Sequence, residues 1–324
     1  MKKGIKRVLT ILLAAFLLLS LLPYLFPLSD AKLSPIPTPY AESQYREVDG
    51  LDLHYRIFTP DHTPKGKLLF IHGLGGSTFS WRENMTFFQD EGYLVIAVDL
   101  PGFGYSSKAS GINHSQARRS QMIWSLLDLV DEDLDELTTN LQWTLLGHSM
   151  GGGTATAMAI DRPSDTKSLV LVDGAVFENQ PSSVSALLAY PPLARGVAVI
   201  FDRILLSAKR IDSFLTSAYG RPATLEEIDG YLTPLKEPGT PKVALDLVKT
   251  SKNVPVEGVQ NNDVPILALW GQEDTWVPLS DAEKIQDLIP RTEIVSISGA
   301  YHCPMETHSE LFNDELLMFL EKTQ

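Results

Sequence analysis

Short runs of consecutive apolar residues recur along the chain and predict a buried sheet. When every position in a strand is apolar, both of its faces are covered, as in parallel sheets flanked by helices. Runs of this kind occur at Leu68–Ile71, Leu94–Val98, Leu145–Leu146 and Leu169–Val172, and further strands are predicted at Pro265–Trp270 and Glu293–Ile297. By contrast, Leu51–Phe58 alternates apolar and polar residues, which predicts a half-exposed strand at an edge of the sheet.

Helix-like stretches lie between these strands. In Ser115–Val130, the side chains of Trp124, Leu127 and Val130 fall on one stripe, as the helical period requires. The alternation of strand and helix predicts an α/β fold with a doubly wound, mostly parallel sheet.

In residues 177–255 the strand-like apolar runs give way to short helix-like stretches. Short helices are predicted there between breaks such as Pro191-Pro192, at Ser185–Tyr190, Arg195–Leu206, Ile211–Ala218 and Lys242–Lys249. This segment either merely thickens the core or covers one edge of the sheet as a helical cap. Its mixture of small helices, aromatic and aliphatic residues favours the cap. We therefore expect two core parts, residues 45–176 and 256–324, on either side of a cap.

The N-terminus combines a basic start with a long apolar run. Lys2, Lys3, Lys6 and Arg7 precede or open the run Val8–Leu28, which reaches the roughly 20 residues that a spanning helix needs. Residues 1–30 are therefore predicted to be an uncleaved membrane anchor with the body outside the cytoplasm, and a cleaved export signal is the alternative. Residues 31–44 are proline-rich at Leu33–Pro39 and predict an extended spacer.

Composition narrows the possible partners. The 324 residues are 44% apolar, enough for one large domain with an elaboration, and the formal net charge is −13. An acidic body argues against nucleic acid, because binding of phosphates needs clustered Lys and Arg. Cys303 is the only cysteine, and no Cys/His cluster has the spacing of metal ligands. No metal or organic cofactor is predicted.

The most informative chemical motif is Gly147-His148-Ser149-Met150-Gly151. It joins an apolar strand-like run to a helix-compatible stretch of small residues, which is the context of a nucleophile elbow. The glycines two positions before and after Ser149 are expected because side chains there would collide with the strand or the helix. Such a turn holds the serine in a strained conformation beside backbone N–H groups that can stabilise an oxyanion.

Further motifs follow in a consistent order. His72-Gly73-Leu74-Gly75-Gly76 and Asp99–Ser106 each follow a predicted strand, as do Gly271–Asp274 and Ser298–His302. Taken together, these motifs resemble those of the α/β-hydrolase superfamily, from about Tyr45 to Leu320 and in the order Ser, Asp, His. The cap segment matches that superfamily only in its position, before the acid-bearing strand.

The resemblance implies a role for each motif. Ser149 would be the nucleophile, His302 its base and Asp274 the acid that orients the imidazole. The backbone N–H groups of Met150 and Leu74 would form the oxyanion hole.

Several alternatives remain open at this point. His308 competes with His302 and Asp173 with Asp274, while Cys303 beside His302 is a weaker candidate nucleophile. Asp99 and His72 are expected to be structural.

The serine nucleophile favours hydrolysis of a carboxylic ester or thioester through an acyl-enzyme. Hydrolysis of a carbon–carbon bond, or amidase or peptidase activity, is the enzymatic alternative. A catalytically silent binding protein is the alternative from another class. The expected substrate is a small-molecule ester, possibly amphipathic.

Overall fold

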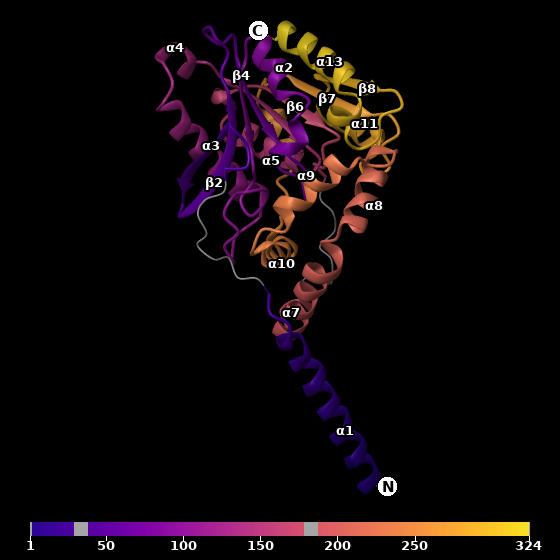
Figure 1. Ribbon diagram of the computed structural model, residues 1–324. Coiled ribbons are helices and arrows are strands. Elements are labelled where there is room, and N and C mark those ends of the chain that lie inside the picture. Colours follow the sequence, from indigo (N-terminus) through magenta and orange to yellow (C-terminus); the bar gives the residue numbers. More distant parts are fainter. Residues whose placement is uncertain (1, 29–37, 178–186, 324) are drawn as a thin grey trace.

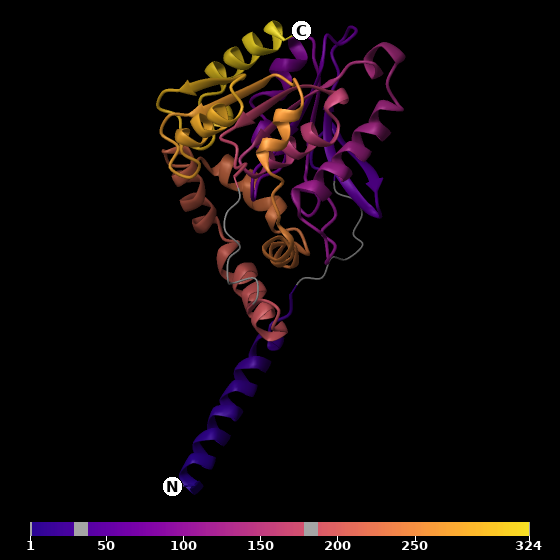
Figure 2. The same ribbon diagram turned by 180° about the vertical axis from the view of Figure 1, so that it is seen from behind.

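Eight strands form a single sheet in the computed structural model, which describes residues 2–28, 38–177 and 187–323 (Figures 1 and 2). Their order across the sheet is β1-β2-β4-β3-β5-β6-β7-β8. The strands are β1 (Ser43–Val48), β2 (Leu51–Phe58), β3 (Lys67–Ile71), β4 (Leu94–Val98), β5 (Trp143–His148), β6 (Thr166–Val172), β7 (Ile266–Gly271) and β8 (Thr292–Ile297). All neighbours are parallel except β1–β2 and β2–β4. The predicted mostly parallel sheet is confirmed.

Helices cover both faces of the sheet. One hydrophobic cluster joins one face to α3 (Gln116–Asp131), α5 (Met150–Asp161) and α11 (Leu279–Leu288). The other face packs against α2 (Met85–Asp90) and α13 (Ser309–Lys322). The predicted helix Ser115–Val130 is α3, and the Ser115 hydroxyl caps it by accepting a hydrogen bond from the N–H of Arg118. Short helices α4 (Glu136–Thr139) and α12 (Pro304–Thr307) complete the core.

A helical insertion lies between β6 and β7, where the cap was predicted. Its described elements are α7 (Pro191–Ile200), the π-helical turn η4 (Phe201–Leu205), α8 (Ala208–Tyr219), α9 (Leu225–Leu235) and α10 (Thr240–Thr250). Part of the predicted helix Ser185–Tyr190 lies outside the described residues.

One helix boundary predicted in this insertion was wrong, and one helix was missed. The predicted helix Arg195–Leu206 begins earlier, because Pro191-Pro192 forms the first turn of α7, where no N–H donor is needed. Helix α9 was not predicted, although Thr224 and Glu227 form a capping box at its start.

The edge of the sheet also differs from the prediction. Leu51–Phe58 is not an edge strand, because β1 pairs along its outer side. Strand β1 begins within the predicted spacer, whose residue Tyr40 packs under the Arg56 guanidinium at 4.2 Å from the ring centre. Of the Leu33–Pro39 run, residues 33–37 lie outside the described residues.

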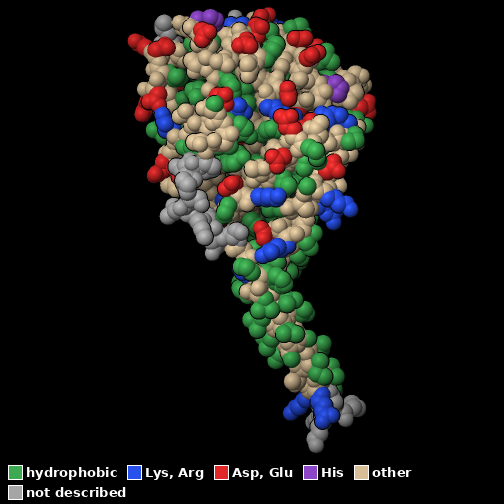
Figure 3. All heavy atoms as spheres, in the orientation of Figure 1, with side chains coloured by type: hydrophobic (Ala, Val, Ile, Leu, Met, Phe, Trp, Pro, Cys, Tyr) green, Lys and Arg blue, Asp and Glu red, His purple; other side chains and the backbone are tan. Residues whose placement is uncertain are grey.

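The N-terminal segment forms a helix that projects from the body (Figures 1 and 3). Helix α1 (Lys2–Leu21) continues into the 3-10 turn η1 (Leu22–Leu25). Residues Ile5–Leu25 are long and apolar enough to cross a membrane, with a mean hydropathy of 2.5, and their side chains are not buried by the body. A signal sequence passes the same test of length and composition.

Candidate active site

The turn between β5 and α5 holds Ser149 in a strained backbone conformation. Its φ and ψ angles are 49° and −119°, in a region that L-residues rarely adopt. A Cβ atom on Gly147 would lie 2.3 Å from the carbonyl oxygen of Gly151, and one on Gly151 would lie 2.4 Å from that of Ile71. Only glycine fits at these two positions, as the motif predicted, and the serine side chain is therefore raised from the sheet edge.

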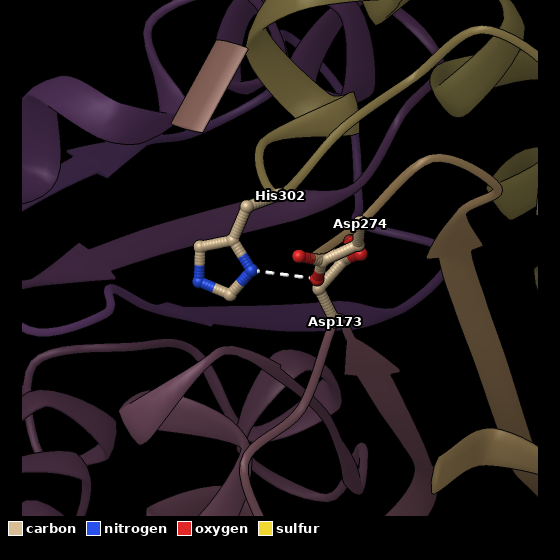
Figure 4. Close-up of side chains that lie close together, drawn as sticks. All are labelled: Asp173, Asp274 and His302. Carbon is tan, nitrogen blue, oxygen red and sulfur yellow. Dashed lines mark hydrogen bonds and ion pairs between the residues drawn. The ribbon is translucent and has the colours of Figure 1, made fainter. Parts of the chain in front are cut away.

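His302 lies in the loop after β8 and is hydrogen-bonded to Asp274 (Figure 4). The distance between Nδ1 of His302 and Oδ2 of Asp274 is 2.7 Å, and both side chains are buried. The other oxygen of Asp274 accepts hydrogen bonds from the backbone N–H groups of Trp276 and Val277. Burial alone would raise the pKa of Asp274, but the hydrogen bond and charge of His302 lower it below its ordinary value. Asp274 is therefore an ionised partner for the imidazole.

Asp173, the competing acid, lies beside Asp274 at the end of β6 (Figure 4). One of its oxygens accepts a hydrogen bond from the N–H of Gly271. Burial, followed by the charge of Asp274, raises the pKa of Asp173 well above its ordinary value. Burial and the neighbouring charge therefore favour the neutral form of Asp173, whereas His302 favours the charged form of Asp274.

Asp173, Asp274 and His302 are also the described residues that could jointly hold a metal ion, since one ligand atom from each lies within 4.8 Å of the others. Two features favour hydrogen bonding instead. The nitrogen of His302 that faces the carboxylates is already bonded to Asp274, and burial favours the protonated form of Asp173. A metal ligand must give up such a proton.

Ser149 and His302 line the same small cavity, with a volume of about 110 Å³. Leu74, Phe214 and Tyr231 line this cavity and also a larger apolar one of about 540 Å³. The larger cavity lies between the core and the helical insertion, and its walls come from α7, η4, α8, α9 and α10. A pocket of this size is typical of small-molecule sites.

The loop after β3, which contains Gly73 and Leu74, packs directly against the turn that holds Ser149. A Cβ atom on Gly73 would lie 3.1 Å from the Cβ of Ser149, so the loop backbone approaches the serine closely. Leu74 follows in this loop, and Met150 is the first residue of α5. His72 donates from Nδ1 to the carbonyl of Gly73 and accepts at Nε2 from the N–H of Leu100, which is a structural role.

The remaining candidates have other surroundings, although Cys303 lines the same small cavity as Ser149 and His302. Asp99 accepts hydrogen bonds from His54 and from the backbone of Thr78 and Tyr105, so it braces two loops. Burial raises the pKa of the Cys303 thiol well above its ordinary value, which disfavours the thiolate that a nucleophile requires. His308 is the N-cap of α13 and bonds Thr307.

Sequence reasoning missed several side chains that surround His302. The Trp276 ring lies 4.9 Å from the His302 ring, and its Nε1 donates to Ser217 of α8. His148 donates from Nε2 to the carbonyl of His302 at 2.8 Å. The N–H of His302 donates to the carbonyl of Ala218, also in α8. The helical insertion is therefore tied directly to the candidate base.

A second link between insertion and core centres on Glu306. Its buried carboxylate accepts hydrogen bonds from Tyr219 of α8, from Tyr231 of α9 and from Arg82 of the core. Burial, opposed by the charge of Arg82, raises the pKa of Glu306 above its ordinary value. Sequence analysis had no signal for this role, because its three partners are far apart in the chain.

The comparison with known proteins shows the family. Residues 67–309 match the family model described as alpha/beta hydrolase fold, and the chain therefore belongs to that family. With the geometry above, this makes the protein a hydrolase on the α/β-hydrolase fold.

Curated relatives differ in the reaction that their names state. The chain is 25% identical to lipase 3 of Moraxella sp. strain TA144 over 282 residues, or 78% of this chain and 77% of that protein. It is also 25% identical to a 2-hydroxy-6-oxononadienedioate/2-hydroxy-6-oxononatrienedioate hydrolase of Burkholderia vietnamiensis, over 89% of this chain and 98% of that protein. The relatives thus include both a lipase and a carbon–carbon bond hydrolase.

Solved structures agree on the fold. A crystal structure of a membrane phospholipase A, described as a bacterial virulence factor, superposes with a TM-score of 0.69. It is 22% identical and covers 100% of this chain and 99% of its own. At this identity the likeness establishes the shared fold and nothing more.

Proposed function

We propose that this protein is a membrane-anchored serine hydrolase that cleaves carboxylic esters through an acyl-enzyme. The observation that carries the proposal is the joint geometry of Ser149, His302 and Asp274. A strained serine and a histidine line one cavity, and that histidine is hydrogen-bonded to an ionised aspartate. This is the arrangement that activates a serine hydroxyl.

Acylation begins at the Ser149 hydroxyl. Nε2 of His302 takes the hydroxyl proton while Oγ attacks the carbonyl carbon of the ester. The carbonyl oxygen becomes an oxyanion, which the N–H groups of Leu74 and Met150 stabilise. His302 then gives its proton to the alkoxide oxygen, the C–O bond breaks and the alcohol leaves. Water, deprotonated by His302, attacks the acyl-enzyme in the same way, and its proton returns to Ser149 as the acid is released.

The charges of the two aspartates support this sequence of proton transfers. Asp274 is ionised, so it fixes the Nδ1–H tautomer and stabilises the imidazolium that forms twice in each cycle. Asp173 acts as a neutral donor to Asp274 and adds no second negative charge that would hold the proton on His302.

The lining of the larger cavity supports an apolar acyl group. Phe103, Val197, Leu206 and Val243 are among the many apolar side chains on its walls. A carbon–carbon bond hydrolase is the second candidate, because the named relative acts on a dioate and Lys108 and Arg210 also line the cavity. A cation there would favour a substrate that carries a second carboxylate.

The N-terminal segment supports an anchored enzyme whose body lies outside the cytoplasm. Basic residues lie at the start of the largely apolar span Ile5–Leu25, and the body follows it. Retention of the segment in the mature protein would be seen by membrane fractionation, since cleavage would release a shorter soluble protein.

Hydrolysis of p-nitrophenyl esters of rising acyl length tests the proposed reaction. The wild-type protein should hydrolyse them, and Ser149→Ala should lose the activity by several orders of magnitude while staying folded. Cleavage of a 2-hydroxy-6-oxo-dienoate in preference to every ester would favour the second candidate. Absence of both activities in the folded protein would favour a silent binding protein.

A further inference from the structure

Helix α7 of the insertion packs along the end of the apolar N-terminal segment. The hydroxyl of Tyr190, the residue before α7, lies 2.7 Å from that of Ser20, and its ring stacks on Phe16 at 5.9 Å. Arg195 donates to the backbone carbonyls of Pro23 and Phe26, and its guanidinium lies over the Tyr24 ring. Helix α7 therefore runs beside the segment and is held there by named polar contacts.

These contacts set the level of α7 relative to a bilayer. The apolar span ends at Leu25, and Phe16 lies more than two helical turns before that end. Tyr190 therefore lies at the depth of the hydrocarbon, whereas Arg195 lies at the end of the span. Arg203 donates to the carbonyl of Pro27, which is one residue closer to the body than Phe26. Helix α7 and η4 thus cross the boundary between hydrocarbon and water, where Arg and Tyr side chains are favoured.

The outer face of α7 and η4 is apolar and exposed. Leu193, Val197, Ile200 and Ile204 recur at spacings of four, three and four, so they form one stripe, and each is at least 39% exposed. In Figure 3, hydrophobic side chains cover the N-terminal stem up to the body, and Lys and Arg side chains lie on the lower part of the body. An apolar stripe beside a spanning helix is suited to the acyl boundary of a bilayer.

The exposed stripe meets the wall of the larger apolar cavity at Val197. Val197 and Leu205 line that cavity, yet they are 39% and 43% exposed. A side chain that is both exposed and cavity-lining marks a thin wall or a mouth. At the opposite end, the cavity shares Leu74, Phe214 and Tyr231 with the small cavity that contains Ser149. An apolar route therefore leads from the level of the membrane surface to the nucleophile.

We infer that the acyl chain of a bilayer ester lipid enters the larger cavity beside Val197 and Leu205, and that the scissile ester then reaches Ser149. This inference rests on the proposed ester hydrolysis and names its substrate class. The acyl chain passes from hydrocarbon into an apolar cavity without crossing bulk water, so its CH₂ groups are never exposed to water. In this account the N-terminal apolar segment and the body together extract the lipid from the bilayer and cleave its ester.

The decisive comparison uses one long and one short ester with the full-length protein in phosphatidylcholine vesicles. The double variant Val197→Trp/Leu205→Trp narrows the mouth, and Leu193→Trp is the matched control, because Leu193 lies on the same helix but does not line the cavity. We expect the double variant to lower the ratio of kcat/KM for p-nitrophenyl laurate to that for p-nitrophenyl acetate by at least about tenfold. The control should leave the ratio within about twofold.

If the folded double variant kept the wild-type ratio of the two kcat/KM values, even with both values lowered equally, the route would be wrong. If the wild-type protein hydrolysed neither ester, the proposed hydrolase function would be wrong instead. The two failures are thus distinguishable.

A second measurement is independent of how the tryptophan variants fold. Cys303 is buried, so Val197→Cys provides one accessible thiol for a fluorescent label. Lipids with a nitroxide on the acyl chain should quench this label at least about threefold more than a label at Leu225→Cys, on α9. Leu225 is 85% exposed and does not line the cavity. Equal quenching at the two positions would show that α7 does not contact the acyl chains.

Discussion

Two of the buried histidines outside the proposed triad, His114 and His148, should make the protein labile to acid. His114 is inaccessible to solvent, and within the described part of the chain neither of its ring nitrogens has a hydrogen-bond partner. Burial, and then the charge of Arg119, lowers its pKa from 6.5 to about 4. Burial, and then the charge of His302, lowers the pKa of His148 from 6.5 to about 3.

The sign of the effect follows from proton binding. Below pH 6.5 the unfolded chain protonates both histidines, whereas the folded protein leaves them neutral until about pH 4 and about pH 3. The unfolded state thus binds more protons, and stability falls as the pH falls through this window. At about pH 5, protonation of each histidine in the unfolded chain lowers the free energy of unfolding by roughly 2 kcal/mol. A typical total for a folded protein is about 5–15 kcal/mol.

Substitution of His114 removes its contribution to the fall in the free energy of unfolding and leaves that of His148. Urea unfolding, followed by tryptophan fluorescence at about pH 7.5 and about pH 5, gives the free energy of unfolding at each pH. His114→Leu should reduce the fall between the two pH values by roughly 2 kcal/mol relative to wild type. His62→Leu, which removes an exposed histidine, is the control. If His114→Leu lost as much stability as wild type between the two pH values, the ring would not be neutral and buried as described.

Three further predictions concern the site and the anchor. Asp274→Asn should lower kcat about 10³–10⁴-fold, whereas Asp173→Asn, whose amide can replace the donated proton, should lower it less than about tenfold; the reverse ranking in ester kinetics would move the acid to β6. Glu306→Gln should weaken the hydrogen bonds that this carboxylate accepts from Arg82, Tyr219 and Tyr231, and cost about 1.5–3 kcal/mol in urea unfolding; an unchanged midpoint would show that Glu306 does not hold the insertion to the core. Deletion of residues 1–38, which keeps Tyr40 on Arg56, should give a soluble protein that still hydrolyses p-nitrophenyl acetate; a folded truncation without activity would place part of the site in the N-terminus.

The sheet was predictable from sequence because buried parallel strands are apolar at every position. Strand β4 begins and ends where its apolar run does, and β3 begins one residue before its run, at Lys67. Strand β1, with the sequence Ser-Gln-Tyr-Arg-Glu-Val, gave no such signal, because an exposed edge strand has little apolar surface to bury. Its partner β2 was therefore taken for the edge.

The candidate site was predictable as far as local motifs extend. The strain at Ser149 arises in a turn whose flanking glycines can be recognised in the sequence. The hydrogen bond between His302 and Asp274 joins two loops that follow parallel strands and therefore lie at the same edge of the sheet. The contacts of Trp276 and Glu306 with the insertion were not predictable, because they depend on how α8 and α9 pack on the core. The protonation of Asp173 likewise depends on burial beside a second carboxylate.

Covalent labelling of the folded, full-length protein by a fluorophosphonate tests the central claim most directly. The reagent reacts with a serine only where a base activates the hydroxyl and an oxyanion hole receives the phosphoryl oxygen. Mass spectrometry of the digested protein should find one adduct, on the peptide that contains Ser149, and Ser149→Ala should abolish it. An adduct on Ser80, which lines the same small cavity, or no adduct in a protein that hydrolyses the esters, would contradict the assignment.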